Sequence, residues 1–296
     1  MASAEDHDPF PLEIERDELP ASSALSEQEI ENVANGLMSL DQQVVTSTVK
    51  LLAKQEDSDL GRHPTVRKNL VHVILSGTEE AVLWACHAIC SLGQVDPLTR
   101  IQLGRTPGLH LALRDAIQLR RGAVRVAACT ALAALSEVQC EKSSAERIAS
   151  TPGMLEVLVE VMSAEDDEGG GGEGGGMEEV QVKDSAAMVL HNASNCERVA
   201  AAILNTPGML RALRHLSVGP RCKYWDEGCA EPELTCASIN AMCAINNLAK
   251  HPSVRHRIRE TEPGFLCGLS RLLTDLESGK PLPYRKVPPV PRLPTY

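Results

Sequence analysis

The chain has 296 residues and a formal net charge of −11, from 40 acidic and 29 basic side chains. This balance excludes nucleic acid as the main partner, because neutralising phosphates requires clustered Lys and Arg, and it disfavours anionic membranes as well. Aromatic residues make up only 2% of the chain. A core must therefore be packed from aliphatic side chains, which favours an all-α protein over a β-sandwich.

Residues 1–25 are rich in Asp, Glu, Pro and Ser and show no apolar periodicity, which predicts a disordered acidic tail. A secretory signal would need basic residues in this segment, and no apolar run of the chain approaches the roughly 18 residues of a membrane span. We therefore expect a soluble cytoplasmic protein, monomeric on its own, with the nucleus as the alternative compartment.

Helical periodicity begins at Ser26. Ser26 is followed three residues later by Glu29, which is the pattern of a capping box at a helix N-terminus. Four apolar residues then fall on one face of the predicted helix: Ile30, Val33, Leu37 and Leu40.

The tripeptide Thr-Pro-Gly recurs three times, beginning at Thr106, Thr151 and Thr206, and apolar residues at helical spacing follow it each time. Thr is a favourable N-cap and Pro is favoured at the first helical position, so the tripeptide predicts a helix start with the Gly at a tight corner. Residues 63–65 read as a degenerate copy, and residues 261–264 as a copy with one residue inserted.

The prolines of these five copies lie 43, 45, 55 and 56 residues apart, and the two longer intervals each contain an insertion. Residues 164–179 form a Gly/Glu low-complexity run, which predicts a flexible loop, and residues 218–230 form a second insertion. Subtracting either insertion leaves a period of about 40 to 43 residues, typical of a helical solenoid repeat. We expect the repeat domain to span residues 26–279.

Each repeat has the same internal order. The helix after the Thr-Pro-Gly corner is followed by a longer Ala-rich helix, as in EEAVLWACHAICSLG or GAVRVAACTALAALS, and then by a short basic helix, as in HPSVRHRIRE. Together with the endings LHNAS (190–194) and INNLA (245–249), these blocks resemble armadillo repeats. The resemblance implies a right-handed α-solenoid of about four to five repeats. HEAT repeats, the nearest alternative, would lack the recurrent Gly corner.

In armadillo proteins the third helices line a concave groove, where an Asn amide binds the backbone of an extended peptide because it offers both a donor and an acceptor. The equivalent positions here are Ser91, Ala134, Asn192 and Asn247. Importin-type armadillo proteins add a Trp one turn earlier to hold Lys side chains. The equivalent positions here are His87, Thr130, Met188 and Cys243. Only the C-terminal half keeps the amide and no position keeps the Trp, so binding of nuclear-import signals is not expected.

The resemblance thus implies a partner-binding groove, chiefly over the last three repeats. The candidate groove residues are Asn192, Asn195, Asn240, Asn246, Asn247, Met188 and Cys243. The alternative is that Asn192 and Asn247 cap or bridge neighbouring helices, and the sequence leaves both interpretations open.

Most of the ten cysteines occupy small apolar positions of the repeats, where free Cys packs as a small hydrophobic residue. Cys222, Cys229 and Cys236 are evenly spaced, but zinc sites usually have tighter Cys pairs, so we expect no metal. The chain has no carboxylate pair placed for acid/base catalysis, no phosphate-binding Gly loop and no nucleophile signature. We therefore expect no cofactor, no catalytic residue and no enzyme activity.

The C-terminal tail, residues 280–296, is rich in Pro and therefore favours polyproline II. It places a basic residue and two x-Pro steps at the spacing that SH3 domains recognise. The residues of this candidate SH3 ligand are Arg285, Val287, Pro288, Val290 and Pro291. A solvated tail, or a strap over the last repeat, is the alternative.

Two functions are compatible with this organisation. The first is a non-enzymatic scaffold or adaptor that binds a partner protein or an extended peptide in the groove of the solenoid. The alternative is a chaperone cofactor that resembles the armadillo-type nucleotide-exchange factors of heat-shock chaperones. The size of the chain fits both functions, and no motif decides between them.

Overall fold

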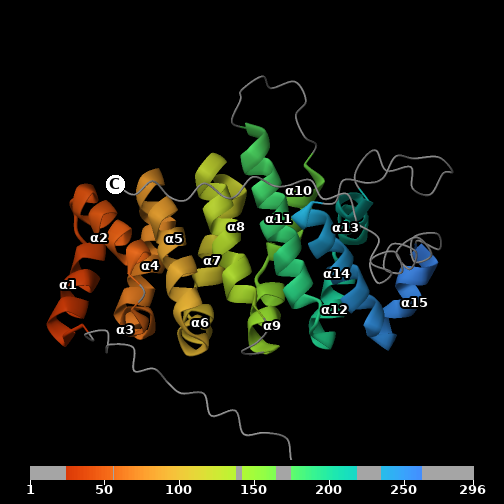
Figure 1. Cartoon of the computed structure of the whole chain (residues 1–296), viewed down its shortest axis with the longest axis horizontal. Coiled ribbons are helices and arrows are strands. Elements are labelled where there is room, and N and C mark those ends of the chain that lie inside the picture. Colours follow the sequence, from red (N-terminus) through yellow and green to blue (C-terminus); the bar gives the residue numbers. More distant parts are fainter. Residues whose placement is uncertain (1–24, 56, 138–141, 165–174, 219–234, 262–296) are drawn as a thin grey trace, which may run out of the picture.

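The computed structural model describes residues 25–55, 57–137, 142–164, 175–218 and 235–261 (Figure 1). These residues form helices and no strand. The helices are α1 (Glu27–Leu37), α2 (Gln42–Lys54), α3 (Ser58–Arg62), α4 (Pro64–Ser76), α5 (Glu79–Val95), α6 (Pro97–Gly104), α7 (Leu109–Leu119), α8 (Gly122–Ser136), α9 (Lys142–Ser150), α10 (Met154–Ser163), α11 (Gly175–Ala193), α12 (Glu197–Asn205), α13 (Met209–Val218), α14 (Cys236–Lys250) and α15 (Pro252–Thr261). None of them is long and apolar enough to cross a membrane.

The helices form triplets that stack along the long axis of the molecule (Figure 1). Helices α3–α5, α6–α8, α9–α11 and α12–α14 are complete triplets, each with a short first helix, a second helix and a third helix. Helices α1 and α2 take the second and third places of a leading repeat, and α15 takes the first place of a following one. The fold is therefore an all-α solenoid with the repeat order that the sequence predicted.

The third helices form one continuous row. Each packs on the next, α2 on α5, α5 on α8, α8 on α11 and α11 on α14, and Figure 1 shows them side by side. Small residues allow this close approach, since Ala127, Ala128 and Ala131 of α8 are fully or almost fully buried. One hydrophobic cluster runs from Ala34 in α1 to Ile258 in α15. The described part of the chain is therefore a single domain, and its buried core contains no aromatic residue, as the composition indicated.

The predicted capping box at Ser26 is confirmed. The Ser26 side chain accepts from the Glu29 backbone N–H, and the Glu29 carboxylate accepts from the Ser26 backbone N–H at 2.8 Å. The helix ends at Leu37, however, and Leu40 is fully exposed. Including Leu40 in the apolar face was wrong, because Asp41 caps a new helix, α2, and turns the chain before a further helical turn can form.

The helix-start interpretation of Thr-Pro-Gly is wrong in detail. Helix α7 begins at Leu109, after the tripeptide, and Gly108 precedes it with φ +81°. The Leu109 N–H donates to the Thr106 carbonyl at 3.2 Å, which is the hydrogen bond of a β-turn with Pro at its second position and a left-handed Gly at its third. The other two copies have the same turn, at Gly153 with φ +75° and Gly208 with φ +79°.

The Thr of each copy ends the preceding helix instead of capping the next. The Thr106 hydroxyl donates to the Gln102 carbonyl at 3.0 Å, and the Thr206 hydroxyl does the same to Ala202. The degenerate copy differs, because Pro64 is the first residue of α4. Each tripeptide is therefore a turn between a first and a second helix, and the repeat spacing inferred from it holds.

The flexible loop predicted over residues 164–179 is shorter at its C-terminal end, because α11 begins at Gly175. The first turns of α11 are stabilised by an ion pair from Glu179 to Lys183, one turn later, at 3.8 Å. The other segments predicted to lack repeats lie largely outside the described residues. These are the N-terminal tail, most of the insertion at 218–230 and the C-terminal tail with the candidate SH3 ligand at 285–291. The end of the predicted repeat domain, residues 262–279, also lies outside the described residues.

Candidate functional site

The solvent-facing side of the row formed by α2, α5, α8, α11 and α14 is a continuous surface, which we call the third-helix face. Its side chains recur at spacings of three, four and seven residues along each helix, as expected for one face of a helix. From α2 to α14 they are Val44, Ser47, Leu51, Trp84, His87, Thr130, Met188, Asn192, Asn240, Cys243 and Asn246, all exposed or half-buried. In an armadillo solenoid this side of the third helices is concave.

The N-terminal part of the third-helix face, over α2 and α5, is apolar and aromatic. Val44 and Leu51 are 42% and 48% exposed. The Lys50 ammonium lies 5.7 Å from the ring centroid of Trp84 and pairs with the Glu80 carboxylate at 2.6 Å. A cation at this distance is attracted by the face of the indole ring. The indole is thereby held at the surface between the two helices.

His87 extends this aromatic cluster. Its ring centroid lies 5.6 Å from that of Trp84, and burial lowers the pKa of the imidazole below its usual value. The half-buried, uncharged ring therefore contributes apolar area. The two rings therefore pack on each other at the third-helix face.

The C-terminal part of the third-helix face, over α11 and α14, is polar. The Asn240 amide donates to the Asp184 carboxylate at 3.0 Å, and its oxygen lies 3.3 Å from Nδ1 of His191. Burial raises the pKa of Asp184, and the hydrogen bond from Asn240 opposes that shift. This network connects α11 with α14. Met188, 39% exposed, lies beside it as an apolar side chain.

The armadillo amide position joins adjacent third helices. Asn247 is only 6% exposed, and its amide donates to the His191 carbonyl at 3.3 Å. Asn192 donates to the Ser136 hydroxyl at 3.0 Å. Ser91, at the equivalent position of α5, donates to the Ala53 carbonyl of α2 at 3.0 Å. These bonds match the bridging alternative that the sequence left open.

The remaining candidate asparagines differ in how much hydrogen-bonding capacity they retain. The Asn195 amide, in the turn after α11, donates to the His191 carbonyl at 3.2 Å, and Asn240 is engaged with Asp184. The half-buried Asn246 side chain makes no hydrogen bond to the described residues. The carbonyl oxygen of Asn192 likewise accepts none from them. Asn246 and Asn192 therefore keep groups that could bind a peptide backbone.

The cysteines of the described chain act in packing. Burial raises the pKa of Cys86 and Cys129 to about 12, so both remain neutral thiols at physiological pH and are poor nucleophiles. Cys243 lies half-buried on the third-helix face, and burial raises its pKa as well. Cys222 and Cys229 lie outside the described residues, whereas Cys236 is the first residue of α14. The described residues contain no cluster of His, Cys, Asp and Glu that could hold a metal ion.

The sequence prediction missed the N-terminal part of the third-helix face. Val44 and Leu51 were not among its candidates, because the first repeat lacks a clear consensus ending. Their spacing of seven residues was a usable signal, since it places two exposed apolar residues on one face of α2. The Lys50–Trp84 contact had no signal, because only the packing of α2 on α5 brings these side chains together.

Comparison with solved structures shows that the chain has an armadillo-like repeat fold. A designed armadillo repeat protein matches with a TM-score of 0.63 and 18% identity, over 85% of this chain and 93% of its own. A second one, solved in complex with the peptide (KR)4, matches with a TM-score of 0.60 and 17% identity, over 86% and 93%. An engineered protein matches with a TM-score of 0.59 and 15% identity, over 86% of this chain and all of its own. Neither a family model nor a curated protein matches the chain.

Proposed function

We propose that this chain is a non-enzymatic scaffold or adaptor that binds a partner protein, through an extended segment, on the third-helix face. The observation that carries the proposal is the continuous row of third helices with exposed side chains along its whole length. Such a surface suits an extended segment, because each repeat offers an equivalent position at a regular interval. The designed armadillo protein solved with a bound peptide supports peptide binding as a use of this fold.

The chemistry of the face indicates what the segment carries. Over α11 and α14, Asn246 and the oxygen of Asn192 offer hydrogen bonds to a peptide backbone, and Met188 offers an adaptable apolar contact. Over α2 and α5, Leu51 and the Trp84 indole offer a larger apolar surface. Interface energy concentrates in such aromatic anchors. We therefore expect a partner segment with an apolar anchor at one end and a more polar stretch at the other.

The structure also improves the choice of variants. Replacing Asn247 would remove a buried hydrogen bond between α11 and α14, so lost binding could reflect lost stability. Met188→Glu and Leu51→Glu instead place a charge on exposed parts of the face. Leu111→Glu is the matched control, because Leu111 is 40% exposed but lies on the second helix α7, outside the third-helix face.

The test is affinity capture with the full chain and these three variants, followed by quantitative mass spectrometry. Circular dichroism and thermal unfolding first establish that each variant is folded. A partner of the third-helix face should be kept by wild type and Leu111→Glu, and reduced about tenfold or more by Met188→Glu or Leu51→Glu. If both face variants keep every partner at the wild-type level, the third-helix face is not the binding surface.

A further inference from the structure

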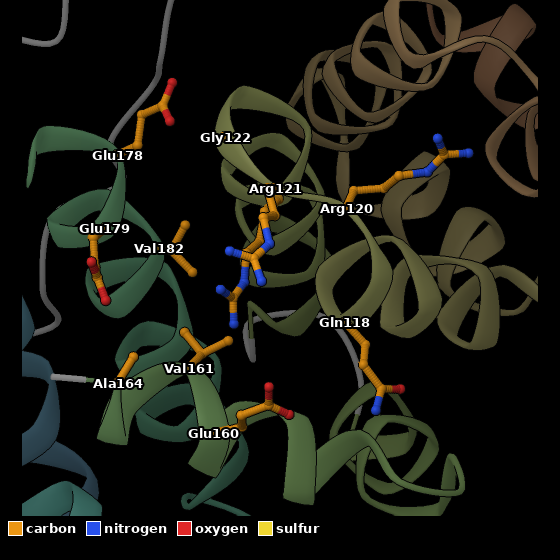
Figure 2. A pocket seen from close by; sticks show the side chains of 11 residues that line it. Gln118, Arg120, Arg121, Gly122, Glu160, Val161, Ala164, Glu178, Glu179 and Val182 are labelled. Atoms are coloured by element: carbon orange, nitrogen blue, oxygen red, sulfur yellow. The ribbon is translucent and has the colours of Figure 1, made fainter. Parts of the chain in front are cut away.

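A second surface feature, separate from the third-helix face, lies at the edge where two repeats meet. It is a cavity of about 320 Å³, at the lower end of the size range of small-ligand pockets. The walls are the end of α7, the start of α8, the end of α10 and the start of α11. The side chains that matter for its chemistry are Arg121, Arg125, Glu160, Val161, Glu178 and Glu179 (Figure 2).

Two arginines of this cavity form no ion pair within the part of the chain that the structure describes. Neither Arg121 nor Arg125 makes an ion pair or side-chain hydrogen bond to the described residues. The Nε of Arg125 is buried and unsatisfied, and a buried donor without an acceptor destabilises the folded chain. Figure 2 shows the Arg121 side chain directed toward Val161 and Val182, whereas Arg120 extends away from the cavity. The Arg121 side chain is exposed and that of Arg125 is half-buried.

The carboxylates of the cavity form no ion pair with these arginines. Glu179 pairs with Lys183 at 3.8 Å. Glu178 lies against the first residue of α8, since a Cβ on Gly122 would be 3.3 Å from its Oε2. A carboxylate there is favourable, because the N-terminal N–H groups of α8 have no side-chain cap. Glu160 lies on the end of α10, so the lining holds three glutamates against three arginines, with no ion pair between them.

We propose that this cavity binds an oxyanion, either a carboxylate or a phosphate, between Arg121 and Arg125. Guanidinium groups match both anions by charge-assisted, often bidentate hydrogen bonds. Val161 and Val182 exclude water from one side of the anion and strengthen those bonds. The overall negative charge of the chain does not prevent binding, because charges beyond about 8 Å are largely screened at physiological ionic strength. Glu160 sets the affinity by opposing the bound charge.

The site would let an acidic or phosphorylated group dock at the edge of the solenoid. Anion binding in this cavity requires no partner on the third-helix face. Its experimental test is therefore independent of the proposed scaffold function. A free anion and an anion carried by a peptide share the same chemistry, so the experiment distinguishes these two sources.

The primary measurement follows the arginine Nε–Hε signals of the full chain by NMR while inorganic phosphate is added. The Arg125→Gln variant assigns the Arg125 signal. We expect that signal to shift saturably, and the shift of Arg211, an exposed arginine on α13, to stay small and linear. An Arg125 signal that stays fixed, or that follows Arg211, would overturn the site.

Three variants measure how single charged side chains contribute to phosphate binding. Arg125→Gln should weaken phosphate binding about tenfold, the loss of one charge-assisted pair. Glu160→Gln, isosteric and on the opposite wall, should strengthen binding several-fold, and Arg211→Gln should change nothing. Unaltered binding in both Arg125→Gln and Glu160→Gln would contradict the proposal.

Peptides that carry one phosphoserine, one glutamate or one serine then identify the source. Binding of the phosphoserine or glutamate peptide more tightly than inorganic phosphate assigns the site to a peptide-borne anion. Equal affinity for the phosphoserine peptide and the free ion assigns it to the ion alone. Binding of the serine peptide as tightly as the charged peptides would show that the anion makes no contribution and would overturn the site.

Discussion

At the scale of single residues, the position that armadillo proteins use for peptide binding serves here to join repeats. Asn247 and Ser91 each donate to a backbone carbonyl of the preceding third helix, at 3.3 and 3.0 Å. A buried amide that has found such a partner would lose that bond on turning to a ligand. The groups that remain for a partner are therefore Asn246, the oxygen of Asn192 and the apolar side chains near them.

His110 makes stability dependent on pH. It is buried in α7, its Nε2 has no hydrogen-bond partner, and burial, with the nearby Arg147 charge, lowers its pKa to about 4. The unfolded chain, with a pKa near 6.5, binds a proton between these values while the folded chain does not. The free energy of unfolding should therefore fall by about 2 kcal/mol from pH 7 to pH 5 through this residue.

Urea unfolding of wild type and His110→Gln at both pH values measures this contribution. The variant should lose less stability than wild type on acidification. His72→Gln, on the exposed surface of α4, serves as the control and should behave as wild type. Equal pH dependence of wild type and His110→Gln would show that His110 is protonated in the folded protein.

At the scale of elements, the Thr-Pro-Gly corner shows which features of a helix boundary can be predicted from the sequence. Thr-Pro-Gly predicted the start of each second helix and the spacing between repeats. Both predictions agree with the structure to within a few residues. It did not predict that Thr would close the preceding helix, because Thr can cap either element with its one hydroxyl. The choice depends on the left-handed Gly, which turns the chain before the second helix starts.

The corner at Gly208 provides a stability prediction. Its φ of +79° is unfavourable for an L-residue, and a Cβ would lie 3.3 Å from Cγ1 of Val159. Gly208→Ala should lower the free energy of unfolding by about 1–2 kcal/mol. Gly93→Ala is the control, because Gly93 lies within α5 with its nearest neighbour, Leu103 Cδ1, at 4.0 Å. Helix propensity predicts that this variant is up to about 1 kcal/mol more stable.

Chemical denaturation of wild type and both variants gives the change in free energy of unfolding that each substitution causes. The two variants should change the free energy of unfolding in opposite directions. This difference in sign distinguishes backbone strain at Gly208 from the general effect of adding a methyl group. A Gly208→Ala variant as stable as wild type would mean that the corner adopts another conformation.

At the scale of the whole molecule, the hydrophobic core of the described residues extends along the stacked helices from α1 to α15. Each triplet packs on its neighbours, so stability is expected to be a sum of local terms and to vary along the chain. Helix α1 buries only Ala34 and Leu37, whereas α8 lies between α5 and α11 and buries nine residues.

Native-state hydrogen exchange should reveal this gradient. Amides of α8 should exchange about tenfold or more slowly than those of α1, because opening α1 disrupts fewer buried contacts. Peptide-level mass spectrometry resolves the two helices. Equal protection of both would indicate that the chain unfolds as a single cooperative unit.

The sequence by itself determined the class of fold, the repeat length and the order of helices within a repeat. These properties depend on local patterns: apolar periodicity, capping residues and a Gly that permits a tight turn. It also placed Met188, Asn192 and Asn246 on the third helices, where they now line a common face.

Only the tertiary structure decided what these side chains do. Asn247 donates to the His191 carbonyl and Lys50 contacts Trp84 because helices of adjacent repeats pack at one specific distance and rotation. The same packing leaves the Arg125 Nε without an acceptor among the described residues. Those contacts join residues about 30 to 60 positions apart in the chain, so no local pattern contains them. The predicted helix starts moved by two residues, from Pro107 to Leu109 in the first copy, because the left-handed Gly108 turns the chain before the helix begins.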